Sequence, residues 1–245
     1  MSSIATIAHD SIRRAALAPS SHNTQPWRFR VLDGGHVIEL RADRARRLPV
    51  NDPDDRELTL SCGCALMNLR IGAAAAGVRV RPDERPSADD PDLLARITLD
   101  SEGGVDPALG ALDAVIAERR TDRGPFRPEP IAAPIIERLA AAAEAEGAWL
   151  KPITDPAIKT ALAGLIADGD ARQWADPAWR DELAAWLRTR RAGDGLTVPA
   201  LARPFARLTI RHLDLGRRIG RRDRRLAETA PMLAVLCTAA DDTHA

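Results

Sequence analysis

The sequence predicts an α+β fold in which helices pack on an antiparallel-rich sheet and two related halves share one chain. Short apolar segments flank glycine turns, as in Trp27–Leu32 and His36–Arg41 around Gly34-Gly35, and this pattern is typical of a β-hairpin. Longer segments with apolar residues at helical spacing separate the strands. A similar succession of elements begins again near residue 106. We therefore expect a first half at 1–105 and a second half at 106–245.

The elements of the first half follow from local signals. A helix is expected over 4–18, followed by a polar segment and the hairpin. The carboxylates of Asp52-Pro-Asp-Asp-Arg-Glu57 suit the N-terminus of a long helix over 57–77, which Gly77 ends. Short strands at 78–80 and 95–99 complete this half.

The second half is expected to contain helices over 107–120 and 134–146, a strand over 149–153 and further helices to about 192. We interpret residues 171–225 as a helical insertion, within which the arginine-rich stretch 203–225 forms an amphipathic helix with a solvated basic face. The apolar strand 232–237 is followed by eight residues, whereas the matching strand of the first half leads into its core helix. On this comparison we expect the C-terminus to be incomplete.

Composition bounds the class of protein. The 245 residues carry no net charge and are 45% hydrophobic, which is enough to bury one large core or two small ones. There is no run of about 18 uncharged apolar residues and no basic signal-like N-terminus, so the cytoplasm is the default compartment and no membrane partner is expected. Cys62, Cys64 and Cys237 are interpreted as buried small apolar residues, and the five histidines lack metal-ligand spacing, so no metal is expected.

Residues 18–27, here called the cradle, are the first candidate site. The sequence Ala18-Pro-Ser-Ser-His-Asn-Thr-Gln-Pro-Trp27 places six polar residues between two prolines. Ser, Asn, Thr and Gln side chains donate and accept hydrogen bonds, and proline limits rearrangement of the backbone. The segment therefore suits a rigid polar binding surface better than a flexible linker.

The second candidate is Arg119-Arg-Thr-Asp-Arg123, at a helix-to-loop junction. Guanidinium groups bind phosphate through two hydrogen bonds and stay charged at every relevant pH, so this cluster suits a phosphate monoester. Taken alone, the segment also fits a solvated helix end, where arginine interacts favourably with the helix dipole.

Together with Asp52–Glu57 and the following Ser61–Leu69, these segments resemble the nitroreductase-like flavoproteins, and within them the single-chain, internally duplicated Acg-like group. The resemblance covers most of residues 10–240 and implies a nitroreductase-like fold. Ordinary members are homodimers with FMN at the subunit interface. Here the second half lacks the Ala-Pro-Ser loop and the first half lacks the Arg-Arg-Thr segment. The resemblance therefore implies one flavin site built from both halves, and a homodimer stays an option.

The resemblance also implies roles for individual residues. Arg119, Thr121 and Arg123 would hold the phosphate and ribityl end of FMN. The isoalloxazine and ribityl side would be lined by five cradle residues: Pro19, Ser20, Ser21, Asn23 and Gln25. No catalytic side chain is assigned, because the flavin itself would transfer hydride or electrons. NAD(P)H would be the electron donor, and a nitro compound, a quinone or a similar small molecule the acceptor.

Three other functions compete with this one. Ser20 or Ser21 with His22 does not suggest a hydrolase, because no G-x-S-x-G elbow is present. The arginines of 203–225 would suit a polyanion, but few aromatic residues lie among them, and no nucleic-acid partner is expected. The third is a protein that binds or stores FMN without turnover, in which the insertion with Trp174, Trp179 and Trp186 covers the flavin.

Overall fold

The computed structural model describes residues 3–240, which divide into two compact units. Of the described residues, unit 1 comprises those up to 120 and 181–211, and unit 2 comprises 121–180 and those from 212 onward. The expected insertion is shared between them, since 181–211 belongs to unit 1 and its flanks to unit 2. The boundary expected between 105 and 106 concerns two related halves of the sequence, and it stays a prediction.

Unit 1 is an α+β structure built on a four-stranded antiparallel sheet with the strand order β1-β2-β4-β3. Its principal elements are α1 (Ile4–Ala15), β1 (Trp27–Leu32), β2 (Val37–Ala42), α2 (Arg56–Ala75), β3 (Arg79–Glu84), β4 (Leu93–Asp100), α3 (Pro107–Ala111) and α4 (Asp113–Ile116). Single 3-10 turns lie at Ser21–Asn23, Asp33–Gly35 and Arg44–Arg46. The residues from 187 onward add the two-residue parallel strands β6 (Leu187–Arg188) and β7 (Leu196–Thr197), with a 3-10 turn at Arg190–Ala192 between them.

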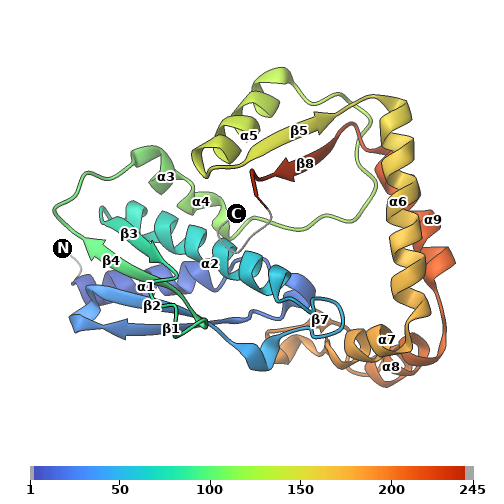
Figure 1. Ribbon diagram of the computed structural model, residues 1–245, viewed down its shortest axis with the longest axis horizontal. Coiled ribbons are helices and arrows are strands. Elements are labelled where there is room, and N and C mark those ends of the chain that lie inside the picture. Colours follow the sequence, from blue (N-terminus) through green and yellow to red (C-terminus); the bar gives the residue numbers. More distant parts are fainter. Residues whose placement is uncertain (1–2, 241–245) are drawn as a thin grey trace. The chain divides into compact units, whose positions relative to one another are not determined.

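The core of unit 1 lies where α1 and α2 cover one face of the sheet (Figure 1). Alternate residues of β2 and β4, such as Ile38, Leu40 and Ile97, are fully buried there, as the period of a half-buried strand requires. Leu69 of α2 meets them from the helix side. Among the described residues, α2 alone is long and apolar enough to cross a bilayer, but core helices share this property and its buried face belongs to this core.

Both ends of α2 agree with the sequence signals. The carboxylate of Asp52 accepts a hydrogen bond from the Leu58 backbone N–H at 2.9 Å, which satisfies one of the free N–H groups of the first turn. The helix ends at Ala75, and Gly77 follows in the left-handed region with φ +79°. The predicted hairpin is also confirmed, because Trp27 pairs with Ala42 and Leu32 with Val37 across the turn at 33–35.

Unit 2 contains α5 (Ala133–Ala145), β5 (Trp149–Ile153), α6 (Pro156–Ala175), α9 (Gly216–Thr229) and β8 (Leu233–Cys237). β5 and β8 form an antiparallel pair, with Trp149 opposite Cys237. Helices α7 (Pro177–Ala185) and α8 (Arg203–His212) each run across a division between the units.

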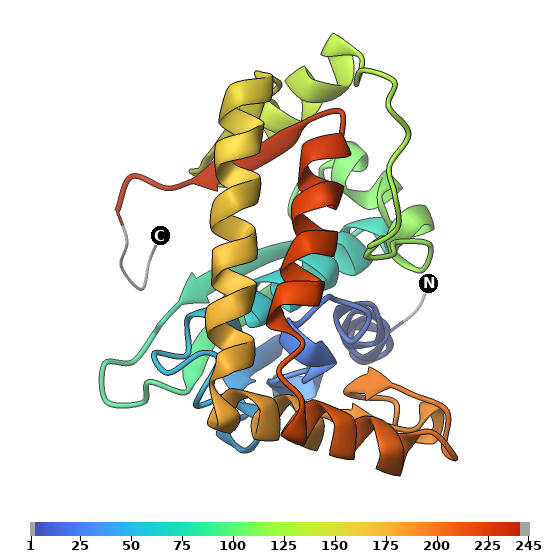
Figure 2. The same cartoon turned by 90° about the vertical axis from the view of Figure 1, so that its right-hand side faces the viewer.

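Helices α6 and α9 lie side by side in unit 2 (Figure 2). The two backbones approach closely at Gly220, where an added Cβ would lie 2.9 Å from the carbonyl oxygen of Ala167. Asp170 of α6 is half-buried near Asp223 of α9, and one of its carboxylate oxygens has no hydrogen-bond partner in the structure. Burial, and then the charge of Asp223, raise the pKa of Asp170 above its ordinary value.

The structure corrects three expectations. The helix expected over 107–120 is two short helices that end at Ile116, so the arginine segment is irregular chain. The single amphipathic helix expected within 203–225 is divided into α8 and α9: residues 213–215 are not helical, and there the Asp214 carboxylate accepts a hydrogen bond from the Gly216 N–H at 2.8 Å, where α9 begins. Cys62 is buried as expected, but Cys64 is exposed, since two residues advance a helix to another face.

Candidate functional site

The cradle has a constrained backbone. His22, Asn23 and Gln25 all lie in the left-handed region, with φ of 49°, 53° and 52°, which non-glycine residues adopt rarely. Hydrogen bonds hold this conformation: the Asn23 N–H donates to the Ser20 carbonyl at 2.9 Å, and the Gln25 N–H donates to the Ser20 hydroxyl at 2.9 Å. Backbone strain of this kind concentrates at binding and catalytic sites. The cradle is thus rigid, as its two prolines predict.

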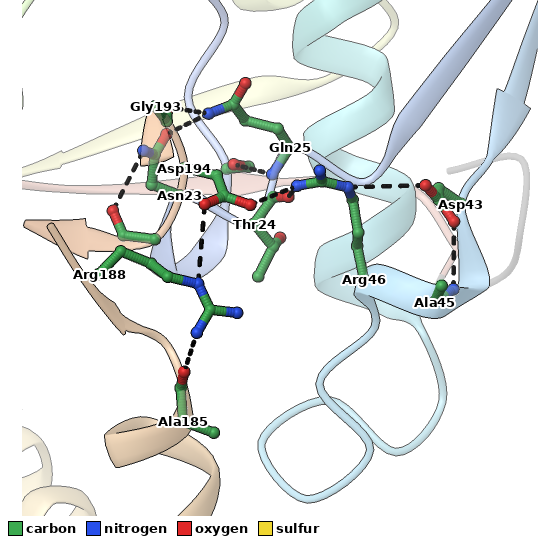
Figure 3. Close-up of polar contacts among 12 residues, drawn as sticks. Asn23, Thr24, Gln25, Asp43, Ala45, Arg46, Ala185, Arg188, Gly193 and Asp194 are labelled. Carbon is green, nitrogen blue, oxygen red and sulfur yellow. Dashed lines mark hydrogen bonds and ion pairs between the residues drawn. The ribbon is translucent and has the colours of Figure 1, made fainter. Parts of the chain in front are cut away.

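A turn at residues 193–195, distant in the sequence, is bonded to two cradle residues that are predicted to bind the flavin (Figure 3). The Gln25 side-chain amide donates to the Gly193 carbonyl oxygen at 2.7 Å, and the Asn23 side-chain amide donates to the Gly195 carbonyl oxygen at 3.2 Å. In return, the Gly195 N–H donates to the Asn23 carbonyl at 2.9 Å. Residues 193–195 are therefore bonded to the amides that the family resemblance assigns to a flavin. The glycines at 193 and 195 were the available signal for a turn.

An ion network fixes this turn. The Asp194 carboxylate lies between two guanidinium groups, at 2.8 Å from Arg46 Nη1 and 3.7 Å from Arg188 Nε. Arg46 Nη1 also donates to the Thr24 carbonyl at 2.9 Å, so the same guanidinium contacts both the turn and the cradle (Figure 3). Asp43 lies on the other side of Arg46 at 3.6 Å. Sequence reasoning missed Arg46 and Asp194 because nothing local indicates that residues 148 positions apart meet.

A small pocket adjoins the cradle in unit 1. Its cavity of about 10 Å³ has room for about one water molecule and is far too small for a flavin ring. The lining residues come from the cradle, the following loop and the start of α2: Ser21, Thr24, Arg46, Arg47, Leu48, Asp52, Glu57, Leu58 and Ser61. Of the predicted site residues, Ser21 lines this pocket. The two residues that precede Ser21 in the sequence, Pro19 and Ser20, are half-buried.

Within the arginine segment, alternate residues have different roles. The Arg120 guanidinium donates to the carbonyls of Ala117 and Arg119 at 2.7 and 2.9 Å, and the Asp122 carboxylate accepts from the Gly124 N–H at 2.7 Å. These contacts shape the local chain after α4. The three side chains predicted to bind phosphate are exposed and make no hydrogen bond or ion pair with any residue in 3–240: Arg119, Thr121 and Arg123. Their polar groups are available to a ligand.

Arg119 is close to α2 in unit 1. Although Cys64 is exposed, partial desolvation by the surrounding chain raises the pKa of its thiol, and the positive charge of Arg119 acts in the opposite direction, which places the guanidinium near this thiol. Two residues earlier on α2, the Cys62 thiol contacts the Pro26 carbonyl at the end of the cradle at 3.4 Å. The first half of α2 therefore has neighbours in both candidate segments. Thr121 and Arg123 belong to unit 2.

These features define an α+β protein with a rigid polar cradle and an exposed cluster of guanidinium groups. The chain is 33% identical over 195 residues to "Putative NAD(P)H nitroreductase Rv3131" of Mycobacterium tuberculosis, and the match covers 78% of this chain and 53% of that protein. It is 29% identical over 195 residues to "Putative NAD(P)H nitroreductase acg" of the same organism, covering 80% of this chain and 58% of that protein. The chain is thus a homologue of proteins that are named as nitroreductases, and it spans about half of their length.

Comparison of structures finds a nitroreductase family protein from Streptococcus pneumoniae TIGR4, with a TM-score of 0.32 and 18% sequence identity. The match covers 42% of this chain and 82% of that chain. No family model matches the sequence.

Proposed function

We propose that the protein is an FMN-dependent oxidoreductase of the nitroreductase type, which passes reducing equivalents from NAD(P)H to a nitro compound, a quinone or a similar acceptor. The observation that carries the proposal is the strained, hydrogen-bonded cradle, found in a chain 33% identical to a protein named as a nitroreductase. Bound FMN would supply the hydride and electron chemistry. The protein's own residues would bind the cofactor and set its surroundings.

The phosphate end of FMN fits the arginine segment. Within residues 3–240 the guanidinium groups of Arg119 and Arg123 have no hydrogen-bond or ion-pair partner, and Thr121 adds a hydroxyl donor between them in the sequence. A dianionic phosphate monoester accepts several hydrogen bonds, and charge-assisted bonds of this kind are the strong ones. The segment therefore offers the donors that the cofactor's phosphate requires.

The cradle has the chemistry that a flavin ring requires, but its amides are engaged. The ring carries carbonyl and nitrogen acceptors and an N–H donor, which match the hydroxyl of Ser20 and the side-chain amides of Asn23 and Gln25. In the structure these amides donate to Gly193 and Gly195. We infer that residues 193–195 exchange these bonds with the ligand when FMN binds to the cradle.

The test is titration of flavin-free protein with FMN and, separately, with riboflavin, which lacks the phosphate. Arg119→Ala and Arg123→Ala should each weaken FMN binding by about 1.5–3 kcal/mol, the range for a hydrogen bond to a charged group. Riboflavin affinity should change little. Arg30→Ala, an exposed arginine of β1, is the control for the loss of one positive charge. Unchanged FMN affinity in both variants would remove the phosphate role of this segment.

A second function is FMN binding or storage without turnover, and the bonded turn at 193–195 favours it. If these residues keep the cradle covered in the flavin-bound protein, the flavin is retained but a substrate does not reach it. Anaerobic mixing with NADH or NADPH, followed by a nitroaromatic acceptor, separates the two functions. Reduction and reoxidation of the flavin indicate an oxidoreductase, and a bound flavin that neither nucleotide reduces indicates storage.

A further inference from the structure

The solvent-facing side of α9 in unit 2 is strongly basic. Gly216, Gly220 and Ala227 are buried, and the helix lies against α6 (Figure 2). The opposite side presents six exposed arginines: Arg217, Arg218, Arg221, Arg222, Arg224 and Arg225. Arg224 pairs with Glu228 at 2.8 Å. Within residues 3–240, the side chains of four other arginines make no hydrogen bond or ion pair, namely Arg217, Arg218, Arg221 and Arg225.

Arg222 differs from these neighbours because it contacts the arginine segment. Its Nη2 atom donates to the backbone carbonyl oxygen of Arg123 at 3.2 Å, which joins two residues 99 positions apart in the sequence. Both residues belong to unit 2. A guanidinium has five N–H donors in a planar fork, and this contact engages one of its nitrogens. Arg222 therefore retains donors for a further acceptor beside Arg123.

The contact also has an electrostatic consequence. It holds a positive charge at the backbone of another arginine, and neither Arg123 nor Arg222 pairs with a carboxylate among the described residues. An anion bound beside this contact would accept hydrogen bonds from the free donors of both side chains, which is the property expected of a phosphate site.

We propose that Arg222 is a further residue of the phosphate site, which positions the Arg123 backbone and adds a second guanidinium for the phosphate of the cofactor. This inference rests on the proposed FMN function and extends it to a residue outside the segment that the sequence assigns. Because Arg222 would act through position and charge at the phosphate, its loss should weaken the binding of FMN and not the binding of riboflavin, which lacks the phosphate.

The experiment compares FMN and riboflavin affinities across a matched set of full-length variants. Arg222→Ala should weaken FMN binding about tenfold or more, the lower end for a lost hydrogen bond to a charged group, and leave riboflavin binding unchanged. Arg222→Lys should recover most of the loss, because an ammonium group keeps the charge and can donate to the carbonyl. Arg221→Ala and Arg225→Ala remove the same charge from the same helix and should bind FMN as the wild type does.

Each other outcome overturns the inference in a recognisable way. An equal loss for FMN and riboflavin would show that Arg222 supports the fold and not the phosphate site. An equal loss in Arg221→Ala would show a general effect of the charge on α9. Wild-type FMN binding in Arg222→Ala would leave the proposed function intact and reject the role of Arg222. If the wild type binds neither flavin, the proposed function fails and the inference fails with it.

Discussion

Gly193 and Gly195 provide a sharp test of the contact between the turn and the cradle. Both glycines lie in the left-handed region, with φ of +74° and +72°. A Cβ added at Gly193 would meet nothing within 4 Å, whereas one added at Gly195 would lie 2.5 Å from the Trp186 carbonyl oxygen and would also overlap Arg188 Cγ. Alanine at the two positions therefore has a similar backbone cost and a very different steric cost.

The expected magnitudes follow from these geometries. A left-handed conformation costs a non-glycine residue about 1–2 kcal/mol, and this is the whole effect expected for Gly193→Ala. In Gly195→Ala the Trp186 carbonyl cannot move freely, because it accepts the Leu196 N–H at 2.9 Å and holds β6 and β7 together. Relief of the overlap should add about 1–3 kcal/mol, as in overpacked cores. The turn should then separate from Asn23.

Hydrogen exchange read by mass spectrometry is the assay, with the peptides around 20–26 and 186–198 followed in the two variants and the wild type. Gly195→Ala should lose protection at 186–198, because the Gly195 N–H loses its acceptor, the Asn23 carbonyl. It should also lose protection at 20–26, because the strained cradle backbone, whose Asn23 and Gln25 N–H groups bond to Ser20, loses the turn that is bonded to it. Gly193→Ala should keep most of the protection in both. Equal protection in the two variants, or loss confined to 186–198, would refute the inference that the turn is bonded to the cradle.

Three further predictions concern other parts of the molecule. The pKa of Asp170 is higher in the folded state than in the unfolded state, so protonation of this carboxylate stabilises the fold. This stabilisation is fully present below the unfolded-state pKa of about 3.9 and is lost as the pH rises through the folded-state pKa. Asp170→Asn should thus raise the urea midpoint at neutral pH and lose this advantage at acidic pH, whereas Asp168→Asn, at an exposed position, should not. Burial raises the pKa of Cys62 to about 12, so iodoacetamide at mildly alkaline pH should label Cys64 and leave Cys62 unmodified until the protein unfolds. The charge of Arg119 lowers the pKa of Cys64, so Arg119→Ala should slow the labelling of Cys64. The double variant Ser20→Ala with Asn23→Ala should change the flavin affinity or the flavin reduction potential, while its melting temperature shifts little. A double variant that unfolds, but whose folded fraction binds FMN normally, would show that the cradle is structural.

Local signals in the sequence predicted the elements that depend on nearby residues. Gly34-Gly35 gave the hairpin, and Asp52 and Gly77 gave the two ends of α2, because caps and turns are formed by residues close in the chain. Asp214 was a comparable signal for the start of α9, and it was overlooked within a stretch interpreted as one basic helix.

The contacts that sequence reasoning missed join distant residues. Asn23 and Gly195 are 172 positions apart, and β6 and β7 have two residues each, too few for a periodic pattern. The alternation in the arginine segment was also hidden, because the sequence does not show that Arg120 and Asp122 bind the local backbone and leave their neighbours available. The cradle and arginine segments were identified from residue type, and their partners required the fold.

The central claim is that this chain binds FMN and that NAD(P)H reduces it. The most direct measurement is the absorbance spectrum of the purified protein after saturation with FMN and removal of the excess, followed by anaerobic addition of NADH or NADPH. We predict that one FMN is retained per chain and that at least one of the two nucleotides bleaches its oxidised bands. A protein that retains no flavin at saturating FMN would contradict the account.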